Sequence, residues 1–306
     1  MPAPAHRPRA FAIASVVAVL AGCSVFVDLD GLAGPLAVDG GEDAATTLEA
    51  GQAGDAGIDV DIPLPRCDAS TTIDEPFTDS FGSFVPIQLQ APGYPTLGAF
   101  DGDKAAVILP IVAVAAGSDA AAPELQTAHS GLWFPTVVPL QEFDVDFEMQ
   151  VRCPVPGSCA DGLAFAWLDL ASAGALTNDN SGHKAGLPEG IAGAAFYADD
   201  YQNDVGETSD PPVPALEIVG IDRAKPVGTY PWVVAARAAS FLGAWHAIGL
   251  RVRGGSVTVT YDGATFLTGS VAPLAQGMVG LTAGTGGETD AIAVRKFKGR
   301  FFACQR

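Results

Sequence analysis

Asp199-Asp200-Tyr201-Gln202-Asn203 is followed in this chain by Asp210-Pro211 and then by Val219-Gly220-Ile221-Asp222. Carboxylates, an amide oxygen and a main-chain carbonyl can converge in such a segment, and Ca²⁺ takes about six to eight oxygen ligands of these kinds. One loop could supply about half of that shell. The alternative is an acidic surface loop in which Asp and Asn side chains only make turns.

Two further segments have the pattern of strand ends. Ala160-Asp161-Gly162 reads as a turn that enters the apolar run 163–167, and residues 278–286 read as a strand that leaves into a Gly-rich loop. In their order along the chain (160–167, 199–222 and 278–286), the three segments resemble those of the L-type (legume-lectin-like, concanavalin A-like) lectin family. The resemblance covers roughly residues 75–303.

The resemblance implies two overlapping sets of site residues. The calcium ligands would be Asp199, the main-chain carbonyl of Tyr201, Asn203 and Asp210. Sugar hydroxyls would be hydrogen-bonded by Asp161 and Asn203, with Gly162 in the same site and the ring of Tyr201 stacked on a pyranose face. Acceptors, an amide and an aromatic surface suit the hydroxyls and C–H faces of a sugar.

The chain departs from the family at a second, transition-metal site. The family uses a Glu two residues before the first calcium Asp and a His at the start of the Ile-Gly-Ile-Asp strand, where this chain has Tyr197 and Ile218. Neither side chain replaces a carboxylate or imidazole ligand. We therefore expect a single calcium site and no transition metal, unless a shift of one residue brings in Glu217.

The amino terminus resembles a bacterial lipoprotein signal peptide. A basic start is followed by an apolar run over residues 10–21, too short to span a bilayer, and by Leu20-Ala21-Gly22-Cys23. The resemblance implies cleavage after residue 22 and acylation of Cys23, which anchors the chain in the bacterial cell envelope. Ser24 after the cysteine implies sorting to the outer membrane. A generic secretory peptide with an incidental cysteine is the alternative.

Residues 24–66 carry nine acidic residues against the single Arg66 and are rich in Gly, Ala and Asp. Such a segment cannot bury enough apolar surface to fold, so residues 23–66 are predicted to be the acylated cysteine and a disordered linker. The organisation expected is signal peptide 1–22, linker 23–66 and a folded domain 67–306.

Four cysteines remain once Cys23 is set aside, an even number in an exported chain. Three pairings are possible. Cys67 and Cys304 stand at the two ends of the domain, and Cys153 and Cys159 stand at the two ends of a short loop. This placement favours the pairs Cys67–Cys304 and Cys153–Cys159. A zinc site is the alternative, but the spacings contain no CxxC pair.

Strand signals dominate the domain. Apolar residues alternate with polar ones from Phe143 to Val151, from Ile248 to Val252 and from Val257 to Tyr261, and Asp262-Gly263 reads as a hairpin turn. No long amphipathic helix follows residue 23. We predict an all-β, two-sheet jelly-roll sandwich of the concanavalin A-like kind.

Charge restricts the partners. The net charge of −19, with 16 Lys and Arg residues, argues against nucleic acid. The partners expected are a carbohydrate or glycoconjugate, and a membrane only through the lipid anchor.

Two alternatives to a non-catalytic, calcium-dependent lectin remain. Glu142, Asp144, Asp146 and Glu148 alternate on one predicted strand, which resembles the catalytic strand of laminarinase-like glycoside hydrolases built on the same sandwich, although no Glu-x-Asp-x-Glu register fits. The other interpretation of these acids is a solvated outer face. The second alternative is a structural or protein-interaction sandwich that has lost sugar binding.

Overall fold

The computed structural model describes residues 67–90, 94–109, 128–153, 159, 161–170, 185–187, 191–201, 212–221, 232–285 and 290–304. The predicted signal peptide, Cys23 and the linker lie outside these residues, and so do Asn203 and Asp210. No helix long and apolar enough to cross a membrane occurs in the described part of the chain.

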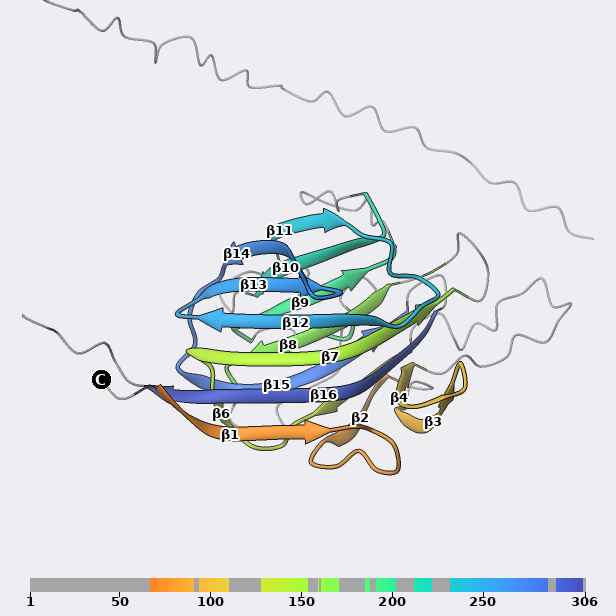
Figure 1. Cartoon of the computed structure of the whole chain (residues 1–306), viewed down its shortest axis with the longest axis horizontal. Helices are drawn as coiled ribbons and strands as arrows, with labels where there is room; N and C mark the ends of the chain where they lie inside the picture. Colours follow the sequence, from red (N-terminus) through yellow and green to blue (C-terminus); the bar gives the residue numbers. More distant parts are fainter. Residues whose placement is uncertain are drawn as a thin grey trace, which may run out of the picture. The chain divides into compact units, whose positions relative to one another are not determined.

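Two antiparallel sheets pack face to face, which confirms the predicted all-β sandwich (Figure 1). The first, called the β7 sheet, has the order β14 (Ala264–Ser270), β13 (Ser256–Tyr261), β12 (His246–Arg253), β7 (Glu142–Arg152), β16 (Ala291–Cys304), β4 (Asp103–Leu109) and β3 (Thr96–Phe100), with β1 (Cys67–Glu75) also paired to β16. The second, called the β8 sheet, has the order β11 (Trp232–Ala238), β10 (Ala215–Ile221), β9 (Gly193–Asp199), β8 (Gly162–Leu168), β15 (Gln276–Gly284), β5 (His129–Trp133) and β2 (Val85–Gln90), with β6 (Val138–Pro139) paired to β15.

The period-two pattern of β7 explains how this sheet covers the core. Phe143, Val145 and Phe147 are buried between the sheets, whereas the acidic residues between them lie on the outer face. Each apolar side chain that leaves water in this way contributes about 1.5–3 kcal/mol.

Aromatic rings fill the space between the sheets. Phe143 of β7 meets Trp167 of β8 edge-on at 5.5 Å between centroids, and Phe147 stacks on Phe297 of β16 at 6.3 Å. Phe165 of β8 contacts the rings of both Phe143 and Phe147. The centre of the domain is therefore fixed by contacts between the two sheets.

The β8 sheet is buried on both faces. Phe165 and Trp167 enter the inter-sheet core, while Ala164, Ala166 and Leu168 join a second apolar cluster on the other face. Leu170 and Leu187, from the connection between β8 and β9, belong to that second cluster. This burial accounts for the nearly continuous apolar sequence of β8.

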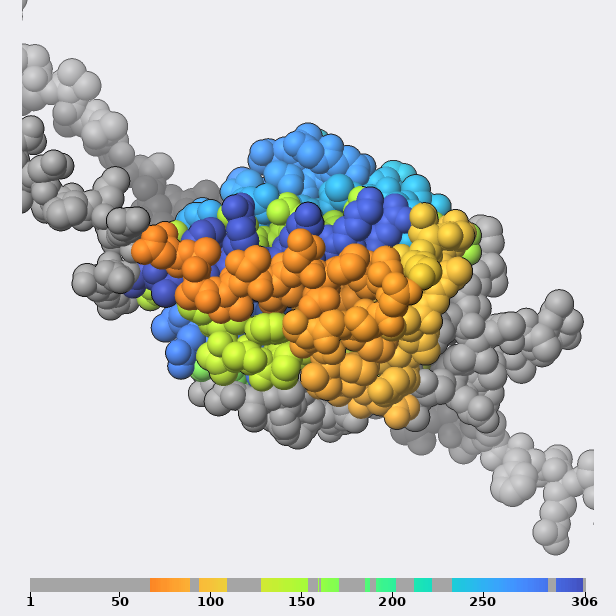
Figure 2. Space-filling view, turned by 60° about the horizontal axis from the view of Figure 1, so that its bottom comes forward, coloured from red at the N-terminus to blue at the C-terminus, as the bar shows by residue number. Residues whose placement is uncertain are grey.

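The chain ends of the domain are held together by β1. Strand β1 pairs with β16 over its whole length, and Figure 2 shows it, in orange, along β16, in dark blue. Disulfide bonds join Cys67 to Cys304 and Cys153 to Cys159, the pairing favoured from the sequence. By restricting the unfolded chain, each bond can stabilise the domain by about 2–4 kcal/mol.

Candidate functional site

Three strand ends meet at one end of the β8 sheet. Gly162 at the start of β8 pairs with Asp199 at the end of β9 on one side and with Gly284 at the end of β15 on the other. The amide of Asp161 also donates a 2.9 Å hydrogen bond to the carbonyl of Gly284. The three segments singled out in the sequence are therefore adjacent in space.

Gly162 is required by the shape of this turn. Its φ of 117° lies in a region that residues with a side chain rarely adopt. A Cβ at this position would also collide with the main-chain carbonyl of Ala198 on β9. The glycine lets β8 start close against β9 and so brings Asp161 beside the end of β9.

Tyr197 of β9 holds the same turn from the other side. Its hydroxyl donates a 2.5 Å hydrogen bond to the main-chain carbonyl of Asp161. Burial raises the pKa of this phenol well above its ordinary value, and the nearby carboxylates of Asp199 and Asp161 raise it further. Tyr197 is therefore a neutral donor throughout the physiological pH range.

The loop that follows β9 begins with a local hydrogen bond. Asp199 is 1% exposed, and its carboxylate accepts a 3.1 Å bond from the amide of Tyr201. Tyr201 is 38% exposed, whereas Asp161 is only 2% exposed. Asn203 and Asp210, the other calcium ligands expected, lie outside the described residues.

Buried carboxyl groups are concentrated at this end of the sheet. Asp200, directly after β9, and Asp290, directly before β16, are 8% and 2% exposed. Burial raises the pKa of Asp200 to about 7. Burial also raises the pKa of Asp290 well above its ordinary value, and the carboxylates of Asp200 and Asp161 add to that effect. A cation bound beside these groups would offset the cost of ionising them.

Comparison with solved structures places this geometry in a known fold. The exoplasmic/lumenal domain of VIP36 in its Ca²⁺/Man3GlcNAc-bound form aligns with a TM-score of 0.56 at 15% sequence identity, over 78% of this chain and 92% of that chain. Basic winged bean lectin with Tn-antigen aligns with a TM-score of 0.58 at 12% identity, over 77% and 99% of the two chains. The carbohydrate recognition domain of Emp47p aligns with a TM-score of 0.51 at 13% identity, over 77% and 96%.

This chain has the L-type lectin fold. No protein-family model and no curated protein sequence matches it. The likeness is therefore one of structure, at sequence identities of 12–15% in these three alignments.

The strand pairing shows what lies beside Tyr197. Tyr197 faces Glu217 across β9 and β10, and Glu217 is buried on the outer face of the β8 sheet. Ile218, expected at the place of the family's His, points into the inter-sheet core instead. The residue beside Tyr197 is therefore Glu217, the alternative that the sequence left open, because alternate residues of a strand face opposite sides.

The acidic strand compared with hydrolases lies on the opposite sheet of the lectin fold. Asp144 accepts hydrogen bonds from Arg253 at 2.7 Å and Arg300 at 3.0 Å. Arg251 binds both oxygens of Asp146, at 2.9 and 3.1 Å. These pairs form a lattice of opposite charges between β7 and its neighbours β12 and β16.

Glu148 is also unsuited to act as a glycosidase acid. Burial would raise its pKa, but hydrogen bonds from Lys296 and Arg295 hold the pKa below its ordinary value. A general acid needs a raised pKa instead. The outer face of β7 is thus an ion-paired surface, close to the solvated face that was the other interpretation of these residues.

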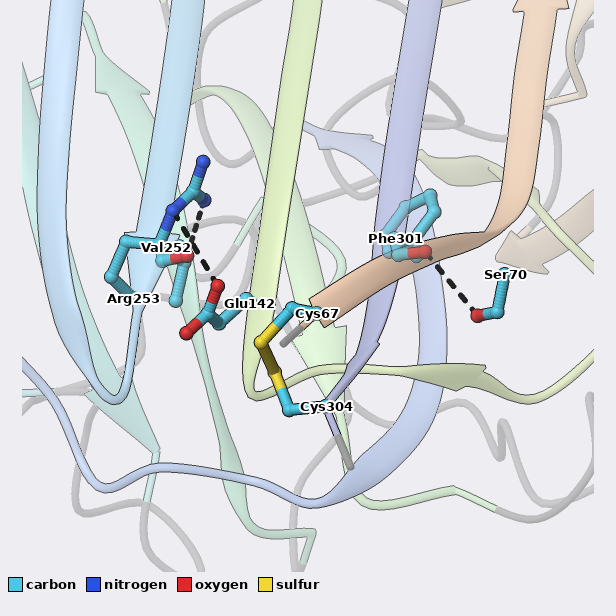
Figure 3. Close-up of a disulfide and its surroundings, with 7 residues drawn as sticks. All are labelled: Cys67, Ser70, Glu142, Val252, Arg253, Phe301 and Cys304. Atoms are coloured by element: carbon cyan, nitrogen blue, oxygen red, sulfur yellow. Dashed lines mark hydrogen bonds and ion pairs between the residues drawn. A yellow bond between two sulfur atoms is a disulfide. The ribbon is translucent and has the colours of Figure 1, made fainter. Parts of the chain in front are cut away.

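Among the described residues, one group of three side chains has the spacing of a metal site: Cys67, Glu142 and Cys304. Figure 3 shows that the two sulfurs form a disulfide and that Glu142 points toward Arg253. A disulfide provides no thiolate ligand, so this group is a structural link between the start of β1 and the end of β16.

Sequence reasoning missed three functional candidates in the lectin fold: Tyr197 as a donor, and Asp200 and Asp290 as a buried carboxyl pair. Asp200 lies within the stretch that was singled out but received no role. The signal for Asp290 is a carboxylate directly before the apolar run Ala-Ile-Ala-Val, because a charge next to a buried strand needs a partner.

Proposed function

We propose that this chain is a calcium-dependent carbohydrate-binding protein without catalytic activity, anchored in a bacterial cell envelope through a lipid on Cys23. The main support for this proposal is the geometry of one turn. The turn at Asp161 is held between Gly284 and Tyr197, directly beside the end of β9 where the Asp199 loop begins. An acidic acceptor, an exposed aromatic ring and a carboxylate-rich loop are thus gathered at one site.

The sugar would be bound by complementary groups. Asp161 offers carboxylate oxygens to vicinal hydroxyls, and the exposed ring of Tyr201 offers an apolar face to the C–H side of a pyranose. Asn203 would add an amide. Asp161 is buried, so Tyr201 is the group that an approaching glycan meets first.

Calcium would bind beside Asp199. Its ligands would be Asp199, the main-chain carbonyl of Tyr201, Asn203 and Asp210, all of them hard oxygen donors. Asp199 is almost fully buried among other acids, so a divalent cation there offsets a charge that burial makes unfavourable. The VIP36 domain was solved in a Ca²⁺-bound form with the same fold, which supports the proposal.

The envelope location rests on the amino-terminal sequence alone. Cleavage before Cys23 and acylation of its thiol would anchor the domain through a linker, with Ser24 directing it to the outer membrane. Growth with labelled palmitate tests this: label should enter the wild type and be absent from Cys23→Ser. Labelled Cys23→Ser, or an unlabelled wild type, would contradict the anchor.

A glycan array tests the binding function. The full chain should bind a subset of glycans in millimolar Ca²⁺ and lose that binding in chelator. If it binds no glycan on a broad array with calcium present, the domain is better described as a structural or protein-interaction sandwich.

A further inference from the structure

Asp200 and Asp290 bring two buried carboxyl groups together from different sheets. Asp200 follows β9 of the β8 sheet, and Asp290 precedes β16 of the β7 sheet. Their side chains interact directly, and both residues are more than nine-tenths buried. The pair therefore sits where the two layers of the sandwich meet beside the candidate sugar site.

No positively charged side chain in the described part of the chain pairs with either group. All four carboxylate oxygens of the pair are buried, and among the described residues no other side chain donates to them, each residue's own main-chain amide being the nearest donor. Asp161, close enough to act on Asp290, adds a further negative charge. Two ionised carboxylates cannot remain in contact inside a protein without a proton or a cation between them.

We propose that Asp200 and Asp290 together hold a hard divalent cation, separate from the calcium proposed at Asp199, Asn203 and Asp210. Carboxylate oxygens favour Ca²⁺ or Mg²⁺ over softer metals, and two carboxylates balance one divalent charge. Main-chain oxygens and water would complete the shell. The cation would tie the start of the Tyr201 loop to β16 and so link the two sheets.

Metal stoichiometry tests the proposal on the full chain. The protein is stripped with chelator, equilibrated with Ca²⁺ alone and analysed for bound calcium per chain. The wild type should bind two ions, Asp200→Asn with Asp290→Asn should bind one, and Asp210→Ala should bind one. Asp74→Asn, which changes an exposed carboxylate on β1, should bind two.

Melting in chelator supplies the control for folding. The two amides can hydrogen-bond to each other, so the double variant should melt at or above the temperature of the metal-free wild type, while its calcium-induced shift is smaller. If the double variant does not fold, the single variant Asp200→Asn takes its place and should bind one ion.

The two calcium proposals fail in different ways. A single ion that is lost in Asp210→Ala and kept in the double variant means that Asp200 and Asp290 share a proton, and it overturns this inference. A single ion that is lost in the double variant and kept in Asp210→Ala supports the inference and overturns the calcium site at Asp199. Two ions in the double variant also overturn the inference, and no bound ion in the wild type overturns both.

Discussion

The hydroxyl of Tyr197 donates its hydrogen bond to the main-chain carbonyl of Asp161, so a side chain of β9 fixes the turn that starts β8. Tyr197→Phe should lower glycan affinity about fivefold, because a buried hydrogen bond contributes about 1 kcal/mol and here it sets the position of the sugar acceptor. The calcium-induced rise in melting temperature should persist. Titration calorimetry and thermal melting measure the two effects.

Tyr261→Phe is the matched control for that change. The hydroxyl of Tyr261, on the β7 sheet, donates to the carbonyl of Ser240 at 2.7 Å and lies 2.8 Å from Nδ1 of His246. Its loss should reduce stability by a similar amount and leave glycan affinity unchanged. Equal affinity losses in the two variants, or loss of the calcium response in Tyr197→Phe, would contradict a positioning role for Tyr197.

Gly162→Ala should disrupt the site more than a glycine change elsewhere. The new Cβ would meet the carbonyl of Ala198 in a backbone region unfavourable to alanine. Gly102→Ala is the control, since Gly102 also has a positive φ, 86°, but has open space around its Cβ direction. The control should cost about 1 kcal/mol in denaturant unfolding, and Gly162→Ala clearly more. Equal costs would show that the contact with β9 does not matter.

Calcium should stabilise the domain. An ion that binds only the folded chain adds RT ln(1 + [L]/Kd), which is about 4 kcal/mol at 1,000 times Kd. Asp199→Ala should lose most of the resulting shift in melting temperature. An identical melting curve for the wild type in millimolar Ca²⁺ and in chelator would remove the calcium claim.

Asp144 should matter for stability and not for chemistry. Asp144→Asn removes a carboxylate that is 7% exposed and bound by Arg253 and Arg300, so it should cost about 1–3 kcal/mol. Asp146→Asn changes a half-exposed partner of Arg251 and should cost less. Neither change should affect glycan binding. Release of reducing ends from β-glucans by the wild type, absent in these variants, would favour the hydrolase interpretation instead.

Local patterns in the sequence were sufficient to predict the fold class and several of its strands and turns. The alternation from Phe143 to Val151 became β7, and Asp262-Gly263 became the hairpin turn between β13 and β14, with φ values of 49° and 82°. Such features depend on side-chain period and turn chemistry within a few residues. The sequence interpretation could therefore place them without knowledge of the tertiary contacts.

The site depended on contacts between distant segments. Glu217 and Ile218 point to opposite sides of β10, and the pairing of β10 with β9 decides which of them lies beside Tyr197. The comparison of sequences had to cross the Pro-rich residues 211–214, and an insertion there obscures the register of β10. The contact between Asp200 and Asp290 joins two sheets over 90 positions of sequence. No local period reports such a contact, which becomes visible only when the sheets are packed.

Calcium-dependent sugar binding at Asp161 can be measured by titration calorimetry of the full chain with a glycan selected on the array, in calcium and in chelator, for the wild type and Asp161→Ala. We expect binding by the wild type in calcium, none in chelator, and an affinity at least about tenfold lower for Asp161→Ala, because loss of a buried acceptor that binds a sugar hydroxyl costs about 1–3 kcal/mol. The calcium-bound melting temperature of the variant should match that of the wild type. Equal affinity of Asp161→Ala and the wild type, or binding that survives chelation, would contradict calcium-dependent sugar binding at Asp161.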